Sequence, residues 1–232
     1  MYSEQDVNNL AQKCVEVLDW SKSDPNYSFP KSLPICLIEA VFSIAANNTS
    51  SKNTYINYMR YYHIMPEEET GIILPEHTVE EFIDNVESFQ NINEFTDTVL
   101  KNRQRTSSKN GILKSEAVYE IAKVLKRYKI SSLSDFQNCS GERYCNLEKE
   151  ILNVKGQSSG IMLKYLHMLA GNENTIKPDR MLMRFICSIN KDITINDAQN
   201  IIDKCVSLLK KYNKNITPRL LDYLIWNYQR SM

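Results

Sequence analysis

The sequence predicts an all-α fold, because three observations point to helices along its whole length. Apolar residues recur at three- and four-residue spacing across residues 3–228, which is the period of helices with one buried face. Residues typical of helix N-termini precede several of these segments, and no stretch alternates apolar and polar residues as a half-buried strand does. With 232 residues, the chain is also long enough to bury a full hydrophobic core.

Four helices are predicted in the N-terminal half. Ser3 and Thr78 each begin a capping-box pattern, which indicates that a helix starts directly after each of them. Residues 33–46 are almost continuously apolar, so we expect a helix buried at the centre of the fold. Residues 53–62 carry aromatic and apolar side chains on one stripe, which predicts an amphipathic helix.

Six helices are predicted in the C-terminal half, each from the same three- and four-residue periodicity. They cover residues 114–128, a short segment ending at Leu152, and residues 160–170, 179–189, 194–209 and 217–228. The polar run 102–111 is expected to be a surface loop. Because the periodicity continues without a linker, we expect residues 1–232 to form a single domain.

Charge is balanced overall but unevenly distributed. The 28 basic and 28 acidic residues give a net charge of zero, which does not by itself indicate nucleic-acid binding. However, residues 67–97 contain ten carboxylates and no lysine or arginine, whereas residues 101–114 contain five basic residues and no acidic one. This asymmetry predicts a basic face, although a solvated loop would have the same composition.

Cysteine and histidine spacing gives no sign of a metal or cofactor. The six cysteines fit neither an iron–sulfur cluster nor a zinc site, and the three histidines lack ligand spacing. We therefore expect no metal and no cofactor. The chain opens with MYSEQDVNN, which does not resemble a signal peptide, and it contains no apolar run of membrane length. We expect a cytoplasmic monomer that does not contact membranes.

Residues 152–185 are the most informative stretch, and they read LNVKGQSSGIMLKYLHMLAGNENTIKPDRMLMRF. A turn of small residues separates two predicted helices, and unpaired backbone amides at such a helix N-terminus suit a phosphate. About twenty residues later, Asp179 follows a proline at the start of the next helix. This arrangement resembles the helix-hairpin-helix DNA glycosylase superfamily.

Two upstream segments resemble the same superfamily in the same order. PICLIEAVFSIAANNTSSKN is similar to its duplex-probing helix and turn, and GILKSEAVYEIAKVL is similar to the segment that opens a mid-barrel helix. The resemblance implies a helical barrel carrying the hairpin at residues 30–171 and a second lobe from residues 1–29 plus 172–232. Gly160 occupies the position of the lysine that forms a Schiff base in bifunctional relatives, and the four-cysteine iron–sulfur loop is missing.

Two carboxylates are candidate catalytic residues. The resemblance implies that Asp179 stabilises positive charge on the deoxyribose and orients or deprotonates the attacking water. Alternatively, Asp179 only caps its helix. Glu39 lies inside an apolar helix segment. The resemblance suggests that it protonates the leaving base, and the alternative is that it faces solvent or pairs with a lysine.

The expected DNA-binding face combines the hairpin, the probing turn and the basic segment. Its members are Gly156, Gln157, Ser158, Ser159 and Gly160 for a phosphate, Asn47 and Asn48 for the gap left by a flipped nucleotide, and Arg103, Arg105, Lys109 and Lys114 for the DNA backbone. An extruded base would stack on Tyr58, Tyr61 and Tyr62. Alternatively, the hairpin is an ordinary interhelical turn and the tyrosines belong to the core.

These features predict a monofunctional DNA glycosylase acting on double-stranded DNA. It would flip a damaged or modified base and hydrolyse its N-glycosidic bond. Alkylated, mismatched and hypermodified viral bases all fit as substrates, in repair or in defence against foreign DNA. Two alternatives remain: a non-catalytic DNA-binding protein on the same scaffold, and an interaction protein whose hairpin only packs.

Overall fold

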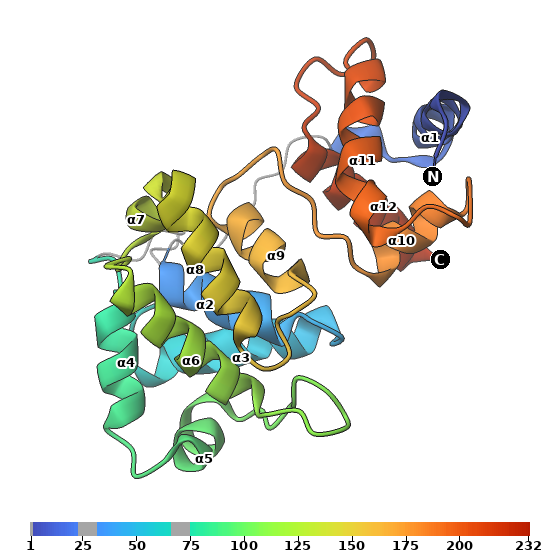
Figure 1. Cartoon of the computed structure of the whole chain (residues 1–232). Coiled ribbons are helices and arrows are strands. Elements are labelled where there is room, and N and C mark those ends of the chain that lie inside the picture. Colours follow the sequence, from blue (N-terminus) through green and yellow to red (C-terminus); the bar gives the residue numbers. More distant parts are fainter. Residues whose placement is uncertain (1, 23–31, 66–74) are drawn as a thin grey trace. The chain divides into compact units, whose positions relative to one another are not determined.

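The computed structural model describes residues 2–22, 32–65 and 75–232, and these residues form an all-helical protein (Figure 1). They contain twelve α-helices, a short 3₁₀-helix and a π-helical turn. An isolated bridge joins Arg105 to Leu113, and the described ranges contain no β-strand. The all-α prediction is therefore confirmed.

The helices form two compact units. The central unit comprises residues 28–170, and the flanking unit comprises residues 1–27 and 171–232. The boundaries expected from the sequence, at residues 30 and 171, lie within two residues of these.

The core of the central unit is built around α2 (Leu33–Phe42). Every residue of this helix is buried, as its nearly continuous apolar sequence predicts. Four helices pack against it: α3 (Asn48–Tyr61), α4 (Val79–Glu87), α6 (Lys114–Arg127) and α9 (Ile161–Leu169). The helix ends four residues earlier than predicted, and Ala45 adopts a left-handed conformation in the turn that follows.

Several elements of the central unit differ from the prediction. The helix α3 begins five residues earlier than expected, because the Asn47 side chain accepts a hydrogen bond from the Ser50 amide at 2.7 Å. Short elements were not predicted, since they contain too few residues to show a periodic pattern. They are α5 (Ile92–Phe95), the π-helical η2 (Thr96–Leu100) and α7 (Leu133–Asn138). Helix α8 (Gly141–Asn153) precedes the hairpin.

The flanking unit has its own hydrophobic core. Helix α1 (Glu4–Val17) packs against α11 (Ile195–Leu209), and α12 (Pro218–Ser231) packs against both α11 and α10 (Arg180–Cys187). The capping boxes predicted at Ser3 in this unit and at Thr78 in the central unit are both present. A short 3₁₀-helix, η1 (Trp20–Lys22), follows α1.

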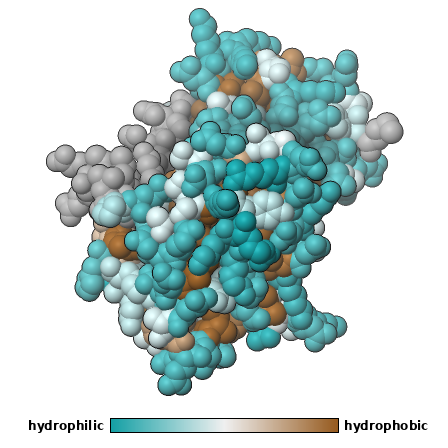
Figure 2. All heavy atoms as spheres, turned by 60° about the vertical axis from the view of Figure 1, so that its left-hand side comes forward, coloured by the Kyte–Doolittle hydropathy of each residue, from teal (hydrophilic) through white to brown (hydrophobic). Residues whose placement is uncertain are grey.

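The surface is mostly polar on the face drawn in Figure 2, where hydrophobic residues appear as scattered patches between hydrophilic ones. None of the helices in the described ranges is long and apolar enough to cross a lipid bilayer.

Candidate functional site

The hairpin, residues 154–160, is a tight turn that joins α8 to α9. Gly156 and Gly160 have φ angles of 89° and 69°, a left-handed region that favours glycine. The Gln157 amide donates to the Val154 carbonyl at 2.9 Å, and the Gly160 amide donates to the Gln157 carbonyl at 3.0 Å. The Gln157 side chain is buried. The prediction that Gln157 contacts DNA is therefore wrong, because both its side chain and its amide are used inside the turn.

Other groups of the hairpin remain accessible to an anion. The side chains of Ser158 and Ser159 are exposed. Gly160 supplies no side-chain cap to α9, and the first amide of that helix, that of Ile161, instead donates to the Ser159 hydroxyl at 3.5 Å. Amides at a helix N-terminus, together with the helix dipole, favour a phosphate. The groups of the hairpin that an anion could still contact are therefore its two serines and the start of α9.

The hairpin lies directly against the basic loop, residues 101–113. A Cβ atom added to Gly156 would lie 2.3 Å from the Cβ atom of Thr106, so only glycine allows this approach. The same loop borders the probing turn, because Asn47, Thr49 and Ser50 line one open cleft of about 770 Å³ together with residues 100–104. The structure thus brings the hairpin, the loop and the turn together within the central unit.

Amide and hydroxyl side chains dominate the lining of this cleft. Asn102 donates to the Thr54 hydroxyl at 2.8 Å, and Gln104 donates to the Ser50 hydroxyl at 3.0 Å. Asn47 contributes the cap of α3, so its carboxamide oxygen is already engaged. The side chain of Asn48 lies outside the described part of the structure.

Lys114 was predicted to contact DNA, and this prediction is wrong. Its side chain is only 4% exposed, and its ammonium group donates to the Phe42 and Ile44 carbonyls at 3.1 and 2.6 Å. A third bond, to the side chain of Gln104, measures 2.9 Å. Lys114 therefore closes the C-terminal end of α2, where a positive charge also complements the helix dipole.

The other three basic candidates are exposed and differ in their bonding. Arg103 forms an ion pair with Asp97, in which its Nη1 atom donates to both carboxylate oxygens at 2.7 and 2.6 Å. The Arg105 guanidinium donates to the Gly111 carbonyl and so closes the loop on itself. Lys109 is exposed and makes no side-chain bond within the described residues. Of these three, Lys109 is the side chain best placed to bind a phosphate.

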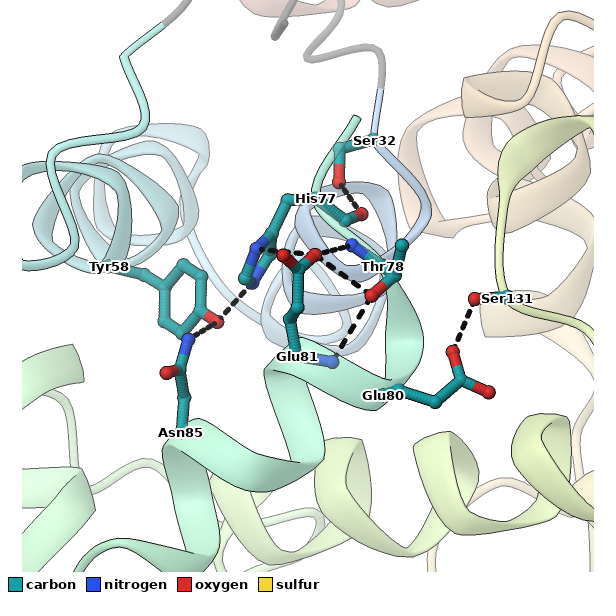
Figure 3. A network of polar contacts seen from close by, with 8 residues as sticks. All are labelled: Ser32, Tyr58, His77, Thr78, Glu80, Glu81, Asn85 and Ser131. Atoms are coloured by element: carbon teal, nitrogen blue, oxygen red, sulfur yellow. Dashed lines mark hydrogen bonds and ion pairs between the residues drawn. The ribbon is translucent and has the colours of Figure 1, made fainter. Parts of the chain in front are cut away.

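Tyr58 belongs to the core and not to a base pocket, so that prediction is also wrong. It is fully buried, and its hydroxyl lies 2.6 Å from His77 Nε2 and accepts from Asn85 at 3.1 Å (Figure 3). His77 Nδ1 lies 3.5 Å from the carboxylate of Glu81. Burial lowers the pKa of His77, and the charge of Glu81 opposes this shift. This order resembles a catalytic triad, but solvent does not reach the hydroxyl.

The two neighbouring tyrosines continue this aromatic cluster toward the surface. The Tyr62 hydroxyl donates to the Asn85 carbonyl at 3.2 Å, and the Tyr62 ring packs 4.9 Å from that of Tyr58. Tyr61 is 45% exposed and lies against Tyr62 and Phe89. None of the three tyrosines lines the cleft. The core alternative therefore holds for Tyr58 and Tyr62, and Tyr61 is the one tyrosine of the three that a base could reach.

Glu39 lies in the interior of the central unit, on α2. Its carboxylate accepts a hydrogen bond from the Tyr165 hydroxyl of α9 at 2.9 Å. Burial and the nearby charge of Glu39 together raise the pKa of Tyr55 and of Cys36. The alternative in which Glu39 faces solvent is therefore excluded.

Asp179 is the N-cap residue of α10 in the flanking unit. Its Oδ1 atom accepts from the Met181 amide at 2.8 Å and from the Leu182 amide at 3.2 Å. Both bonds fall on one oxygen, and Oδ2 holds no hydrogen bond to any residue that the structure describes. Asp179 therefore caps its helix, as the alternative interpretation predicted, and it does so with Oδ1 alone.

Asp222 is a second carboxyl near Asp179 that the sequence analysis missed. It lies on α12, is 6% exposed, and accepts from the Lys177 amide at 2.7 Å. Burial, and to a lesser extent the charge of Asp179, raises the pKa of Asp222 to about 7. The available signal was an acidic residue inside the apolar run LLDYLI, the same kind of signal that singled out Glu39.

Among the described residues, no group of three or more His, Cys, Asp or Glu side chains is arranged to hold a metal ion.

Comparison with known proteins gives one match. A family model described as "Domain of unknown function (DUF8548)" matches residues 8–230, which span both compact units. No curated protein and no solved structure matches the chain.

Proposed function

The chain belongs to this family of unknown function, and we propose that it is a monofunctional DNA glycosylase. We also propose a glycosylase-like helix-hairpin-helix fold. The protein flips a damaged or modified base out of double-stranded DNA and hydrolyses the N-glycosidic bond. The observation that carries this proposal is Asp179, a carboxylate held by two backbone amides at a helix start.

The geometry of Asp179 suits the chemistry of this reaction. Cleavage of an N-glycosidic bond develops positive charge on the deoxyribose, and a fixed negative charge lowers the energy of that transition state. The amides of Met181 and Leu182 hold Oδ1 in place, so Oδ2 can face the sugar or accept a proton from the attacking water. A carboxylate that is already fixed needs little reorganisation when the charge appears.

DNA binding is assigned to the central unit. The serines of the hairpin and the first-turn amides of α9 would bind one phosphate, and Lys109 of the adjacent loop would bind a neighbouring one. The amides and hydroxyls of the cleft can donate to and accept from base edges or sugar oxygens. These features support binding along the surface that the hairpin, loop and probing turn share.

Hydrolysis without strand cleavage follows from the residue at the start of α9. Gly160 replaces the lysine that would attack the sugar, so no Schiff base is expected at this position. The product is then an intact strand that contains an abasic site.

A non-catalytic DNA-binding protein is the second candidate function. It is favoured by the distribution of the candidate residues between the two units. The hairpin, the loop and the cleft all belong to the central unit, whereas Asp179 belongs to the flanking unit. A protein that only binds DNA could therefore use the central unit alone.

The two functions are separated by incubating the protein with a panel of duplexes that carry alkylated, mismatched or hypermodified bases. Alkali treatment then converts abasic sites into strand breaks that a denaturing gel resolves. We expect breaks only after alkali and no covalent adduct with borohydride. Binding to a duplex without excision of any base would favour the second candidate.

A further inference from the structure

The segment that leads to Asp179, residues 172–178, is fastened by side chains of two helices; we call it the Asp179 loop. Gln199 of α11 makes two bonds to its backbone. The Gln199 side chain accepts from the Ile176 amide at 3.2 Å and donates to the Asn174 carbonyl at 2.9 Å. The middle of the loop is therefore held on both sides of Thr175.

The start of α12 holds the beginning of the same loop through Glu173. The Thr217 hydroxyl and the Arg219 guanidinium donate to the Glu173 carboxylate at 3.0 and 2.6 Å. The Arg219 amide also donates to the Glu173 carbonyl at 3.1 Å. Because Arg219 is buried, this contact ties the loop to the interior of the flanking unit.

Asp222, one turn further along α12, acts on the last step of the loop. The Asp222 carboxyl accepts from the Lys177 amide at 2.7 Å. The Lys177 carbonyl accepts from the Asp179 amide at 2.6 Å. Lys177 therefore connects the two carboxyl residues through its backbone. No residue other than Pro178, whose φ angle is fixed by its ring, lies between Lys177 and Asp179.

Protonation explains how two carboxyls can lie near each other at this point. Burial and the charge of Asp179 favour the neutral form of Asp222, whereas the Lys177 amide and ammonium favour the charged form. The resulting pKa of about 7 keeps much of Asp222 neutral near physiological pH. In either form, one carboxyl oxygen can accept from the Lys177 amide.

We propose that Asp222 is a positioning residue for Asp179. By holding the Lys177 amide, it fixes the final step of the Asp179 loop and thereby the direction of the Asp179 carboxylate. The positioning itself is a property of the fold, whereas its effect on the reaction rests on the proposed glycosylase function. If Asp222 were only a structural residue, it would stabilise the flanking unit without fixing the position of the Asp179 carboxylate.

Amide hydrogen exchange tests the positioning directly, because the Met181 and Leu182 amides report whether Asp179 still caps α10. In Asp222→Ala we expect exchange at Lys177, Met181 and Leu182 to accelerate about tenfold or more relative to Phe185 in the same helix. Asp222→Asn keeps an acceptor oxygen and should exchange like the wild type. Asp192→Asn, an exposed residue of the same unit, is the matched control.

Two results of this measurement would overturn the proposal. One is unchanged exchange at Met181 and Leu182 in Asp222→Ala, and the other is an equal acceleration throughout α10. If the alanine variant does not fold, Asp222→Leu replaces it, since leucine fills the space without offering an acceptor.

Single-turnover excision then tests the consequence for the reaction. A carboxylate displaced by about 1 Å loses up to roughly 100-fold in rate, so Asp222→Ala should excise about 10- to 100-fold more slowly at an unchanged DNA dissociation constant. Asp222→Asn should restore the rate to within about threefold of the wild type. Equal losses in both variants would contradict positioning. Absence of excision by the wild type would refute the proposed function, while hydrogen exchange would still decide the role of Asp222.

Discussion

In the central unit the buried ammonium group of Lys114 donates to three oxygen atoms, whereas in the flanking unit the carboxylate of Asp179 accepts both of its bonds on one oxygen. The Asp179 carboxylate lies at the N-terminal end of its own helix, α10. The Lys114 ammonium group lies at the C-terminal end of α2, although Lys114 itself begins α6. Each charge therefore complements the dipole of the helix end that it contacts. Lys114 uses its hydrogen-bonding capacity to hold the fold together. Asp179 accepts no hydrogen bond on Oδ2 from the described residues. The difference separates a charged residue that stabilises the fold from a candidate catalytic one, although the sequence marked both as candidate site residues.

Asp179→Asn should produce the largest effect of the substitutions that test this difference, and the effect should be on the excision rate. The amide keeps an oxygen that caps α10 but removes the negative charge, so excision should fall about 100- to 1,000-fold. Binding to the same duplex should be unchanged within about threefold, as measured by fluorescence anisotropy. Asp192→Asn should retain the wild-type rate. If Asp179→Asn excises at that rate too, its spare oxygen has no role in the chemistry.

Lys114→Met should produce a large effect on stability instead. The substitution removes the donor for the Phe42 and Ile44 carbonyls, and the free energy of unfolding should fall by about 3 kcal/mol. Urea unfolding followed by circular dichroism measures this change. Lys109→Met, at an exposed position, should stay within about 0.5 kcal/mol of the wild type. If Lys114→Met lost DNA affinity without losing stability, this result would indicate that Lys114 contacts DNA after all.

Asp222 should make the flanking unit less stable as the pH rises. Its pKa is about 7 in the folded protein and 3.8 ordinarily, so its contribution is complete below pH 3.8 and disappears as the pH passes 7. Between pH 5 and pH 8 the loss amounts to roughly 2–3 kcal/mol. Asp222→Asn does not titrate, so the difference between variant and wild type isolates this term. A constant difference across that pH range would show that Asp222 is not protonated on folding.

Lys109→Ala should produce the smallest effect. One lost phosphate contact weakens binding a few-fold and reduces the slope of log affinity against log salt concentration by about 1. Replacing Arg103 should change the slope less, because Asp97 already pairs with its charge. Lys129→Ala, at an exposed lysine beyond the end of α6, is the control. Unchanged affinity and slope in the Lys109 variant would remove the loop from the interface.

Sequence periodicity predicted most of the long helices, because one buried face repeats over several turns, but it gave α8 only as a short segment ending at Leu152. It failed for α7, whose six residues are too few to show a period, although Ser132 and Asp135 form a capping box there. It also gave α3 a late start, since the polar first turn of this helix carries no apolar stripe. Local patterns therefore predict the existence of an element better than its ends.

The candidate site was less predictable, because burial depends on contacts between distant segments. Tyr58 and Tyr61 share a polar, tyrosine-rich segment, yet one is buried against His77 and the other is exposed. Lys114 lies beside basic loop residues in the sequence, but its ammonium group contacts carbonyls about seventy residues earlier. The capping of α10 by Asp179 could be predicted, because it depends only on neighbouring residues, Pro178 before it and the helix after it.

The flanking unit is assembled from two segments that lie on either side of the central unit in the sequence, and this has a consequence for how the protein folds during synthesis. Helix α1 is made before α11, against which it packs, and more than 170 residues separate the two helices. The apolar face of α1, with Val7, Leu10, Ala11 and Cys14, therefore lacks this partner until α11 has been synthesised. We expect the central unit to fold first, and the flanking unit to form only after α11 has left the ribosome. The nascent α1 is then the segment of this protein on which a chaperone would act.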